Sequence, residues 1–368
     1  MTSGLLTVNG SVYSSDSTVQ GFVRVGAPFV KDQVPRWHAT EAKEITVKAI
    51  VQDRYGSPDA LELREVDKPA VEDDEVLIKV RAASLNPLDW HLVRGKPFLV
   101  RLLEGMRRPK IPVRGVDVAG IVEAIGRNVT QFQPGDEVFG MRSGAFAEYV
   151  CGKERHFVPK PAGLTFEQAA AVPVAAETAL QGLRDKGQIR SGQKVLINGA
   201  SGGIGTFAVQ IAKAFEADVT GVCSTRNVDL VRSLGADQVV DYTREDFTRT
   251  GQRYDLILDN AGNRSFSDCR RALTPNGTLV LAGQSGRKKT SILPFLKAGL
   301  VSPFMRRQKL VSFIAKHRKE DLVFLKDFME AGKVTPVIDR RYPLREVPEA
   351  IRYVGTGHAR AKVIITME

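Results

Sequence analysis

The stretch KVLINGASGGIGTFAVQIAKAF, residues 194–215, decides the fold. The residues from Lys194 to Asn198 form a short apolar run typical of a buried strand, a glycine-rich turn follows, and an apolar helix is predicted from Gly203. A strand, a glycine turn and a helix in this order open a βαβ unit. We therefore expect a parallel sheet covered by helices in this part of the chain.

The same alternation continues downstream. Strands are predicted at 218–223, 238–241, 254–259 and 277–282, and helices at 228–234 and 265–272. The segment 46–160 differs, because its short strands and Gly/Pro turns predict a small β-barrel. The chain ends in another predicted strand, at 361–366.

The predicted fold class is therefore α/β, with a barrel domain that is interrupted by a doubly wound parallel-sheet domain. Residues 1–45 are expected to be a disordered N-terminal extension, and 46–172 the first part of the barrel domain. Residues 173–304 are expected to form the nucleotide-binding domain, and 305–368 the return to the barrel domain.

The glycine turn predicts a dinucleotide site. The pattern G-x-G-x-x-G falls on Ala200, Gly202 and Gly205, so alanine replaces the first glycine. Gly202 allows close approach of a pyrophosphate, and the start of the helix offers free N–H groups to it. The cofactor-binding residues predicted here are Ala200, Ser201, Gly202, Gly203, Ile204 and Gly205.

The end of the next strand indicates which dinucleotide binds. NAD sites usually carry an acid there, which holds the ribose 2′-hydroxyl. This chain instead has Ser224, Thr225 and Arg226, whose hydroxyl and guanidinium groups can donate to a 2′-phosphate. We predict NADPH as the cofactor; the alternative is that Arg226 is only a solvated surface residue.

Composition excludes several classes of protein. The three cysteines are far apart and form no CxxC pair, which argues against a disulfide framework or a structural zinc lobe. No apolar run is long enough for a membrane span, and no signal-peptide pattern opens the chain, so the cytoplasm is expected. Of the net charge of +11, ten Lys/Arg without any acid lie between residues 286 and 319.

Several motifs resemble one family. The stretches 192–213, 84–90, 115–120 and 172–174 are similar to the quinone oxidoreductase/zeta-crystallin group of zinc-free medium-chain dehydrogenase/reductases, near the chloroplast-envelope quinone oxidoreductase homologues. The resemblance covers about residues 46–368 and implies a GroES-like catalytic domain interrupted by a Rossmann domain. It also implies NADPH-dependent reduction of quinones or α,β-unsaturated carbonyls.

The residues that hold zinc in zinc-dependent members are missing. Asn86 to Asp89 stand where those members have a cysteine, and Gly115–Val116–Asp117 stands where they have a His-Glu pair. Asp89, His91 and Asp117 could be proposed as ligands, but their spacing does not favour a metal site. We expect no metal.

Without a metal, hydride transfer leaves negative charge on a carbonyl oxygen, which needs hydrogen-bond donors and then a proton. The resemblance implies that the loop with Asn86 and Asp89 lines the substrate pocket. Asn86 is expected to donate to the carbonyl, and Asp89 to orient a partner or a water. The alternative for Asp89 is a role as a turn or cap residue. His91 is a candidate proton donor, with an exposed histidine as the favoured alternative and solvent as another proton source.

The resemblance implies further cofactor contacts. Thr178 matches a threonine near the nicotinamide ribose, and Tyr242 a tyrosine of the 2′-phosphate pocket, although a packing role for Tyr242 is an equal alternative. Residues that follow the fourth and fifth strands lie at the carboxyl edge of the sheet, where ligands bind. They are Asn260, Gly283, Gln284 and Ser285.

The expected partner is a small carbonyl or quinone substrate. The family implies a homodimer through an edge strand near 277–282. The basic stretch 286–319, with its apolar segments, allows weak contact with an anionic membrane surface, although a solvated surface is favoured. Nucleic-acid binding lacks the motifs it needs. Rival functions are a zinc-type alcohol dehydrogenase, or an NADPH-binding sensor or RNA-binding protein without turnover.

Overall fold

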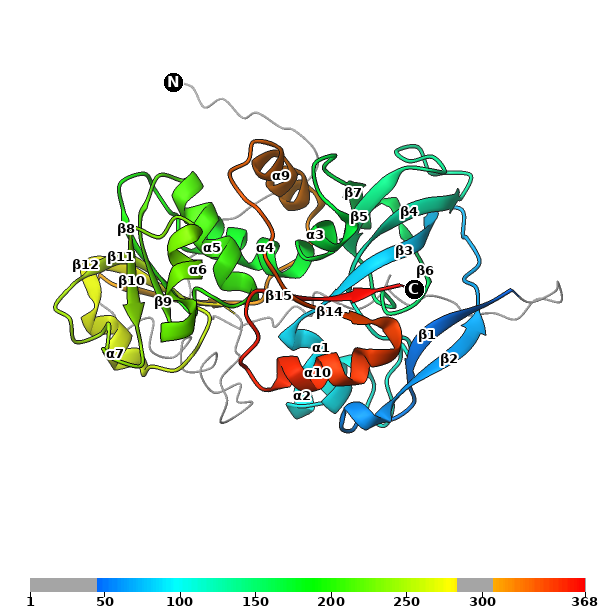
Figure 1. Ribbon diagram of the computed structural model, residues 1–368, viewed down its shortest axis with the longest axis horizontal. Coiled ribbons are helices and arrows are strands. Elements are labelled where there is room, and N and C mark those ends of the chain that lie inside the picture. The colour runs from blue at the N-terminus through cyan, green and yellow to red at the C-terminus, as the bar shows by residue number, and fades with distance from the viewer. Residues whose placement is uncertain (1–44, 283–306, 368) are drawn as a thin grey trace, which may run out of the picture.

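The computed structural model describes residues 45–282 and 307–367, with two lobes that each contain one large sheet (Figure 1). The expected extension at residues 1–45 lies outside this part, except for Ile45. So do Gly283, Gln284, Ser285 and the basic and apolar residues 286–306.

The first lobe is a six-stranded parallel sheet in the order β10-β9-β8-β11-β12-β13. Its strands are β8 (Lys194–Asn198), β9 (Asp218–Cys223), β10 (Gln238–Asp241), β11 (Tyr254–Asp259), β12 (Leu273–Ala282) and β13 (Lys309–Phe313). Strand order reverses direction between β8 and β11, as in a doubly wound fold. The predicted α/β class is confirmed.

Two expectations about this sheet are wrong. The segment 277–282 lies within β12, which pairs with β11 on one side and β13 on the other, so it is not an edge strand. An edge strand has one partner only, and within the described residues the edge strands of this sheet are β10 and β13. Because β13 belongs to this sheet, the chain also leaves it after residue 313, later than the expected boundary at 304.

Helices pack on both faces of the parallel sheet. Most of them form the larger core with β8, β9 and β11, and the helix that precedes β12 packs in a smaller core with that strand. The helices are α4 (Pro173–Leu180), a π-helical turn (Gln181–Lys186), α5 (Gly203–Ala214), α6 (Val228–Ser233), α7 (Phe266–Arg271) and α9 (Lys319–Glu330). Residues 316–318 dock at the end of α4, where Gln181 bonds the backbone of Lys316 in both directions, at 2.6 and 3.0 Å. The end of the basic stretch is therefore attached to the fold.

The second lobe is built on a seven-stranded sheet, with a separate antiparallel pair of β1 and β2 beside it. Its elements are β1 (Thr46–Gln52), β2 (Leu61–Asp67), β3 (Glu75–Leu85), α1 (Pro87–Arg94), α2 (Phe98–Glu104), β4 (Asp117–Ile125), β5 (Glu137–Met141), β6 (Tyr149–Lys153), β7 (Phe157–Pro159), α3 (Phe166–Ala170), β14 (Ile338–Pro343), α10 (Val347–Gly355) and β15 (Lys362–Thr366). Alternating residues of β3, β4 and β15 fill a second core.

The return of the chain joins the two lobes. β15 enters between β14 and β3, and Figure 1 shows it at the centre of the molecule. Just before it, Ala361 pairs with Gly202 and donates its N–H to the Ser201 carbonyl at 2.8 Å. The glycine loop of one lobe therefore touches the last strand of the other.

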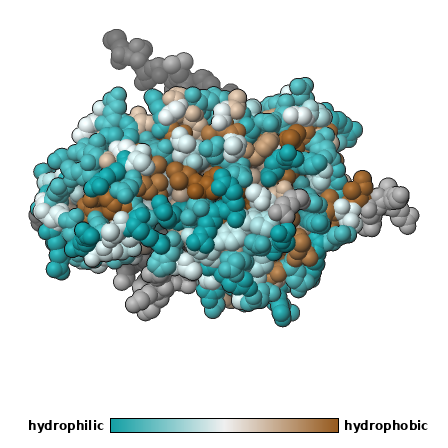
Figure 2. Space-filling view, viewed as in Figure 1, coloured by the Kyte–Doolittle hydropathy of each residue, from teal (hydrophilic) through white to brown (hydrophobic). Residues whose placement is uncertain are grey.

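The face shown in Figure 2 is largely hydrophilic, with apolar side chains gathered in a band across the middle of the view. Across the described ranges, no helix has the length and apolar character that crossing a bilayer requires.

Candidate functional site

The glycine loop has the backbone geometry that a pyrophosphate cradle needs. Gly199 makes the turn with a φ of +84°, and Gly202 precedes α5 without a side-chain cap. A Cβ on Gly205 would lie 2.1 Å from the Gly199 carbonyl oxygen, so only glycine fits there. The start of α5 therefore presents backbone N–H groups to an anion.

Alanine at position 200 is compatible with this loop. The left-handed residue of the turn is Gly199, one position earlier, so position 200 does not require glycine. The Ala200 side chain is buried, and it lies 3.1 Å from the place where a Cβ on Gly221 would be. Its methyl group thus packs on β9 over a residue that has no side chain.

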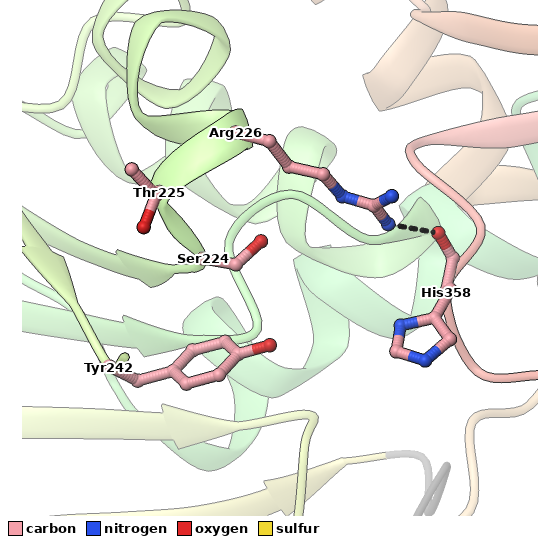
Figure 3. A pocket seen from close by; sticks show the side chains of 5 residues that line it. All are labelled: Ser224, Thr225, Arg226, Tyr242 and His358. Carbon is pink, nitrogen blue, oxygen red and sulfur yellow. Dashed lines mark hydrogen bonds between the residues drawn. The ribbon is translucent and has the colours of Figure 1, made fainter. Parts of the chain in front are cut away.

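The expected 2′-phosphate residues line a recess of about 430 Å³ (Figure 3). Its walls are Ser224, Thr225, Arg226, Tyr242 and His358. Arg226 Nη2 donates to the His358 carbonyl at 2.9 Å, so the guanidinium is held in the wall of the recess by the segment between α10 and β15. His358 was not expected from the sequence, because it lies 132 positions from Arg226.

Thr225 is turned away from the other residues of the recess in Figure 3. Its hydroxyl donates to Asp241 Oδ2 at 2.6 Å. In this arrangement its proton is not available to a phosphate. Ser224, Arg226 and Tyr242 therefore remain as the expected residues that face the recess, and His358 joins them.

Asn227 links the recess to the glycine loop and was also missed. Its amide is buried and donates to Ser201 Oγ at 3.0 Å and to Ser224 Oγ at 3.2 Å. Its Oδ1 has no hydrogen-bond partner among the described residues. The only signal for it in the sequence was its place directly after Arg226.

Thr178 and Asn260, two of the expected cofactor contacts, lie on separate elements. Thr178 is buried on α4, and its hydroxyl donates to the Val174 carbonyl at 2.6 Å. Asn260 follows β11 directly, and its Cβ lies 3.7 Å from where a Cβ on Gly199 would stand. Asn260 is thus at the carboxyl edge of the sheet beside the glycine loop, and Thr178 is on a helix that packs against α5.

The expected catalytic residues Asn86 and Asp89 lie at the start of a helix rather than in a loop, and we call this place the catalytic corner. Asn86 is the residue before α1, and its N–H donates to Asp89 Oδ2 at 2.8 Å. Asp89 is only 2% exposed. Its burial raises the pKa of this carboxyl to about 7. Asp89 therefore caps the first turn of α1.

Asn86 belongs to a buried network with Asp117 and Lys362. Lys362 Nζ donates to Asn86 Oδ1 at 2.7 Å and to Asp117 Oδ2 at 3.3 Å. Asn86 Nδ2 donates to the same Asp117 oxygen at 2.9 Å. Since an ammonium only donates and a carboxylate only accepts, the orientation of the amide is fixed. Lys362 was missed, although a lone charge in an apolar strand is a recognisable signal.

His91 lies at the other end of α1. Its Nδ1 is 3.1 Å from the Lys96 carbonyl, which can only accept, so this nitrogen carries the proton. The imidazole thereby stabilises the turn that follows the helix at Gly95.

The three side chains weighed as zinc ligands do not form a metal centre. The described residues contain no group of three His, Cys, Asp or Glu side chains that could hold a metal ion. The Asp117 carboxylate is already paired with the buried ammonium of Lys362. A divalent cation at that carboxylate would meet a like charge in a site that excludes water.

Two family models and several known proteins match this chain over most of its length. Residues 72–162 match the family model of the alcohol dehydrogenase GroES-like domain, and residues 234–365 match that of the zinc-binding dehydrogenase. The chloroplast envelope quinone oxidoreductase homolog of Arabidopsis thaliana is 34% identical over 86% of this chain and 97% of its own.

Two further proteins are similar over most of their length. The chloroplastic NADPH-dependent alkenal/one oxidoreductase of Arabidopsis thaliana is 32% identical over 93% of this chain and 87% of its own. The solved structure of the quinone oxidoreductase from Coxiella burnetii superposes with a TM-score of 0.77 at 30% identity, covering 88% of this chain and all of that one.

Proposed function

Because the chain belongs to the medium-chain dehydrogenase/reductase family, among its quinone oxidoreductase and enone reductase members, we propose that it reduces quinones or α,β-unsaturated carbonyls with NADPH, by direct hydride transfer and without a metal. Oxidoreductase activity follows from the family. The cofactor preference, the substrate class and the absence of a metal are the proposal.

The observation that carries the cofactor preference is the recess at the end of β9. It offers the Arg226 guanidinium together with Ser224 and Tyr242, and β9 ends without an acid to hold a ribose 2′-hydroxyl. A dianionic phosphate is bound well by a guanidinium and by hydroxyl donors. The similar Arabidopsis alkenal/one oxidoreductase is an NADPH-dependent protein by name, which agrees with this preference.

The residues of the glycine loop fit the pyrophosphate of such a cofactor. Gly202 has no side chain to obstruct the approach of a phosphate, Gly205 lets the helix pack closely on the loop, and the start of α5 supplies N–H donors. When bound, a reduced nicotinamide supplies the hydride. The task of this chain is then to orient the substrate and to stabilise the charge that develops on its oxygen.

The corner at Asn86 suits that task. Asn86 Nδ2 uses one of its two N–H groups on Asp117 and keeps the second for a substrate carbonyl. The ammonium of Lys362 lies 2.7 Å from the amide oxygen and polarises the amide toward donation. Positive charge near a developing oxyanion is thus supplied by a lysine rather than by a metal ion.

The test is a panel of quinones, enones and alkenals, each incubated with the purified protein while NADPH absorbance is followed. We expect oxidation of NADPH with at least one class, and a far smaller kcat/KM with NADH. Addition of a chelator should not change the rate. If NADPH binds but no acceptor oxidises it, the protein is a sensor, and the proposal is wrong. Equal kcat/KM values for NADPH and NADH would contradict the cofactor preference.

A further inference from the structure

Lys362 is the first residue of β15, and its side chain is 2% exposed. Its Nζ has three acceptors, namely the Leu85 carbonyl at 3.2 Å, Asn86 Oδ1 and Asp117 Oδ2. Burial lowers the pKa of this ammonium, and the nearby Asp117 carboxylate opposes that effect. A fully desolvated charge with three partners holds those partners in one geometry.

The same ion pair reaches two elements that carry expected cofactor contacts. The second oxygen of Asp117 accepts the N–H of Val174 at 3.1 Å, which fixes the first turn of α4, the helix that bears Thr178. On the other side, Lys362 Cδ lies 3.2 Å from the place of a Cβ on Gly203. The aliphatic part of Lys362 therefore packs against the start of α5.

Three chain segments thus meet at this one pair: the start of α1 with Asn86, the start of α4, and the glycine loop. The first lies in the barrel lobe, and the other two carry expected cofactor contacts beside the parallel sheet. Within the described residues, no backbone hydrogen bond joins Asn86 directly to the glycine loop, which the last strand contacts through the backbone of Ala361. The side chain of Lys362 connects Asn86 to this loop.

We propose that Lys362, through its ion pair with Asp117, is a positioning residue that sets the distance between the catalytic corner at Asn86 and the glycine loop. This inference rests on the proposed hydride transfer. In such a step the reacting atoms must be held about 3–3.5 Å apart, and a misplacement of about 1 Å can cost roughly 100-fold in rate.

Stability alone does not account for the pair. Replacing a buried ion pair by apolar groups of similar volume is often neutral or stabilising, whereas removing one partner is strongly destabilising. These two effects give a way to separate positioning from structural support. A variant without either charge should fold well and still lack the bridge.

The experiment compares Lys362→Met with the double variant Lys362→Met/Asp117→Asn, using the acceptor found in the panel. We expect kcat to fall by roughly 30- to 100-fold in both, while the Kd for NADPH changes less than about threefold. The primary isotope effect with 4-deuterated NADPH should rise, because hydride transfer becomes slower than the other steps. The double variant should recover the unfolding midpoint that the single variant loses.

The matched control is Lys160→Met. Lys160 is another lysine with a 4% exposed side chain, and it pairs with Glu137 on the barrel rather than with the catalytic corner. It should lose stability and keep kcat. If the double variant recovers both stability and kcat, or if Lys362→Met retains the wild-type kcat, the positioning role is refuted.

Failure of the proposed function would be seen separately, as a wild-type protein that oxidises NADPH with none of the acceptors. Hydrogen exchange then tests the bridge without turnover. Lys362→Met should speed amide exchange at both 86–90 and 199–205, and Lys160→Met should not. Unchanged exchange in either segment would overturn the proposal.

Discussion

At the scale of single residues, Arg226 is the side chain on which the cofactor preference depends. Arg226 is exposed in the turn after β9 of the parallel sheet, and the His358 carbonyl orients it. Its remaining N–H groups therefore stay available to a phosphate. Hydrogen bonds to charged groups contribute about 1.5–3 kcal/mol. Arg226→Ala should therefore raise the KM for NADPH roughly 10- to 100-fold and leave the KM for NADH nearly unchanged.

Steady-state kinetics with both cofactors measure this difference. The matched control is Arg232→Ala on α6, an arginine whose side chain is 65% exposed and whose partner Asp229 is a surface residue. It should alter neither KM by more than about twofold, since such exposed pairs contribute little. An equal rise in the KM values for NADPH and NADH in Arg226→Ala would show that the guanidinium does not bind the 2′-phosphate.

Asp89 gives a second prediction at this scale, because burial raises its pKa to about 7 from the usual value of 3.8. The folded carboxyl keeps its proton up to about pH 7, whereas the unfolded chain loses it near pH 4. Its contribution to stability is therefore complete below pH 4 and is lost as the pH rises from there through 7. The amide side chain of an Asp89→Asn variant would not ionise, and its oxygen would still accept the Asn86 N–H.

We expect the free energy of unfolding of Asp89→Asn, relative to wild type, to rise by roughly 2–3 kcal/mol between pH 5 and 7. Urea unfolding at four or five pH values measures it. A difference that is flat with pH would show that Asp89 is ionised in the folded protein across this range.

At the scale of elements, the glycine loop and α5 act as one unit. A Cβ on Gly205 would lie 2.1 Å from the Gly199 carbonyl oxygen and 2.7 Å from the Ala200 carbonyl carbon, so the loop must move away from the helix. Overpacking of this kind costs about 1–3 kcal/mol. Gly205→Ala should lower stability by that amount and weaken NADPH binding at least tenfold.

Urea unfolding and fluorescence titration with NADPH test this prediction. Gly163→Ala is the control, because a Cβ there would meet no atom within 4 Å. It should change the free energy of unfolding by less than about 0.5 kcal/mol. Tight NADPH binding by Gly205→Ala would mean that the cradle does not depend on this close packing.

The elements also show what the sequence could and could not predict. The stretch 194–215 was predicted well, because a strand, a turn and a helix that follow one another depend on local sterics. Asp117 and Lys362 lie 245 positions apart, and they meet only because β3 pairs with β15 on one side and with β4 on the other. Arg226 and His358, which are 132 positions apart, are likewise brought together by the fold and by no local pattern. The capping role of Asp89 was among the alternatives, but its burial depends on how α1 packs, which no local pattern contains.

At the scale of the whole molecule, the recess is divided between the lobes. Ser224, Arg226 and Tyr242 come from the parallel sheet, whereas His358 comes from the segment that returns to the barrel. A ligand with a 2′-phosphate would therefore touch both lobes. Adenosine 2′,5′-bisphosphate carries that group without the nicotinamide, so it separates this contact from the reaction.

We expect this ligand to slow amide exchange at 224–227 and also at 356–361, while adenosine 5′-monophosphate protects neither segment to the same degree. At about 100 times its Kd it should raise the free energy of unfolding by about 2.7 kcal/mol, if it binds only the folded chain. Arg226→Ala should abolish the protection at 356–361, because the guanidinium is what joins the His358 carbonyl to the recess. Protection confined to 224–227 in the wild-type protein would mean that the phosphate contacts the parallel-sheet lobe alone. The segment 356–361 would then have no part in binding it.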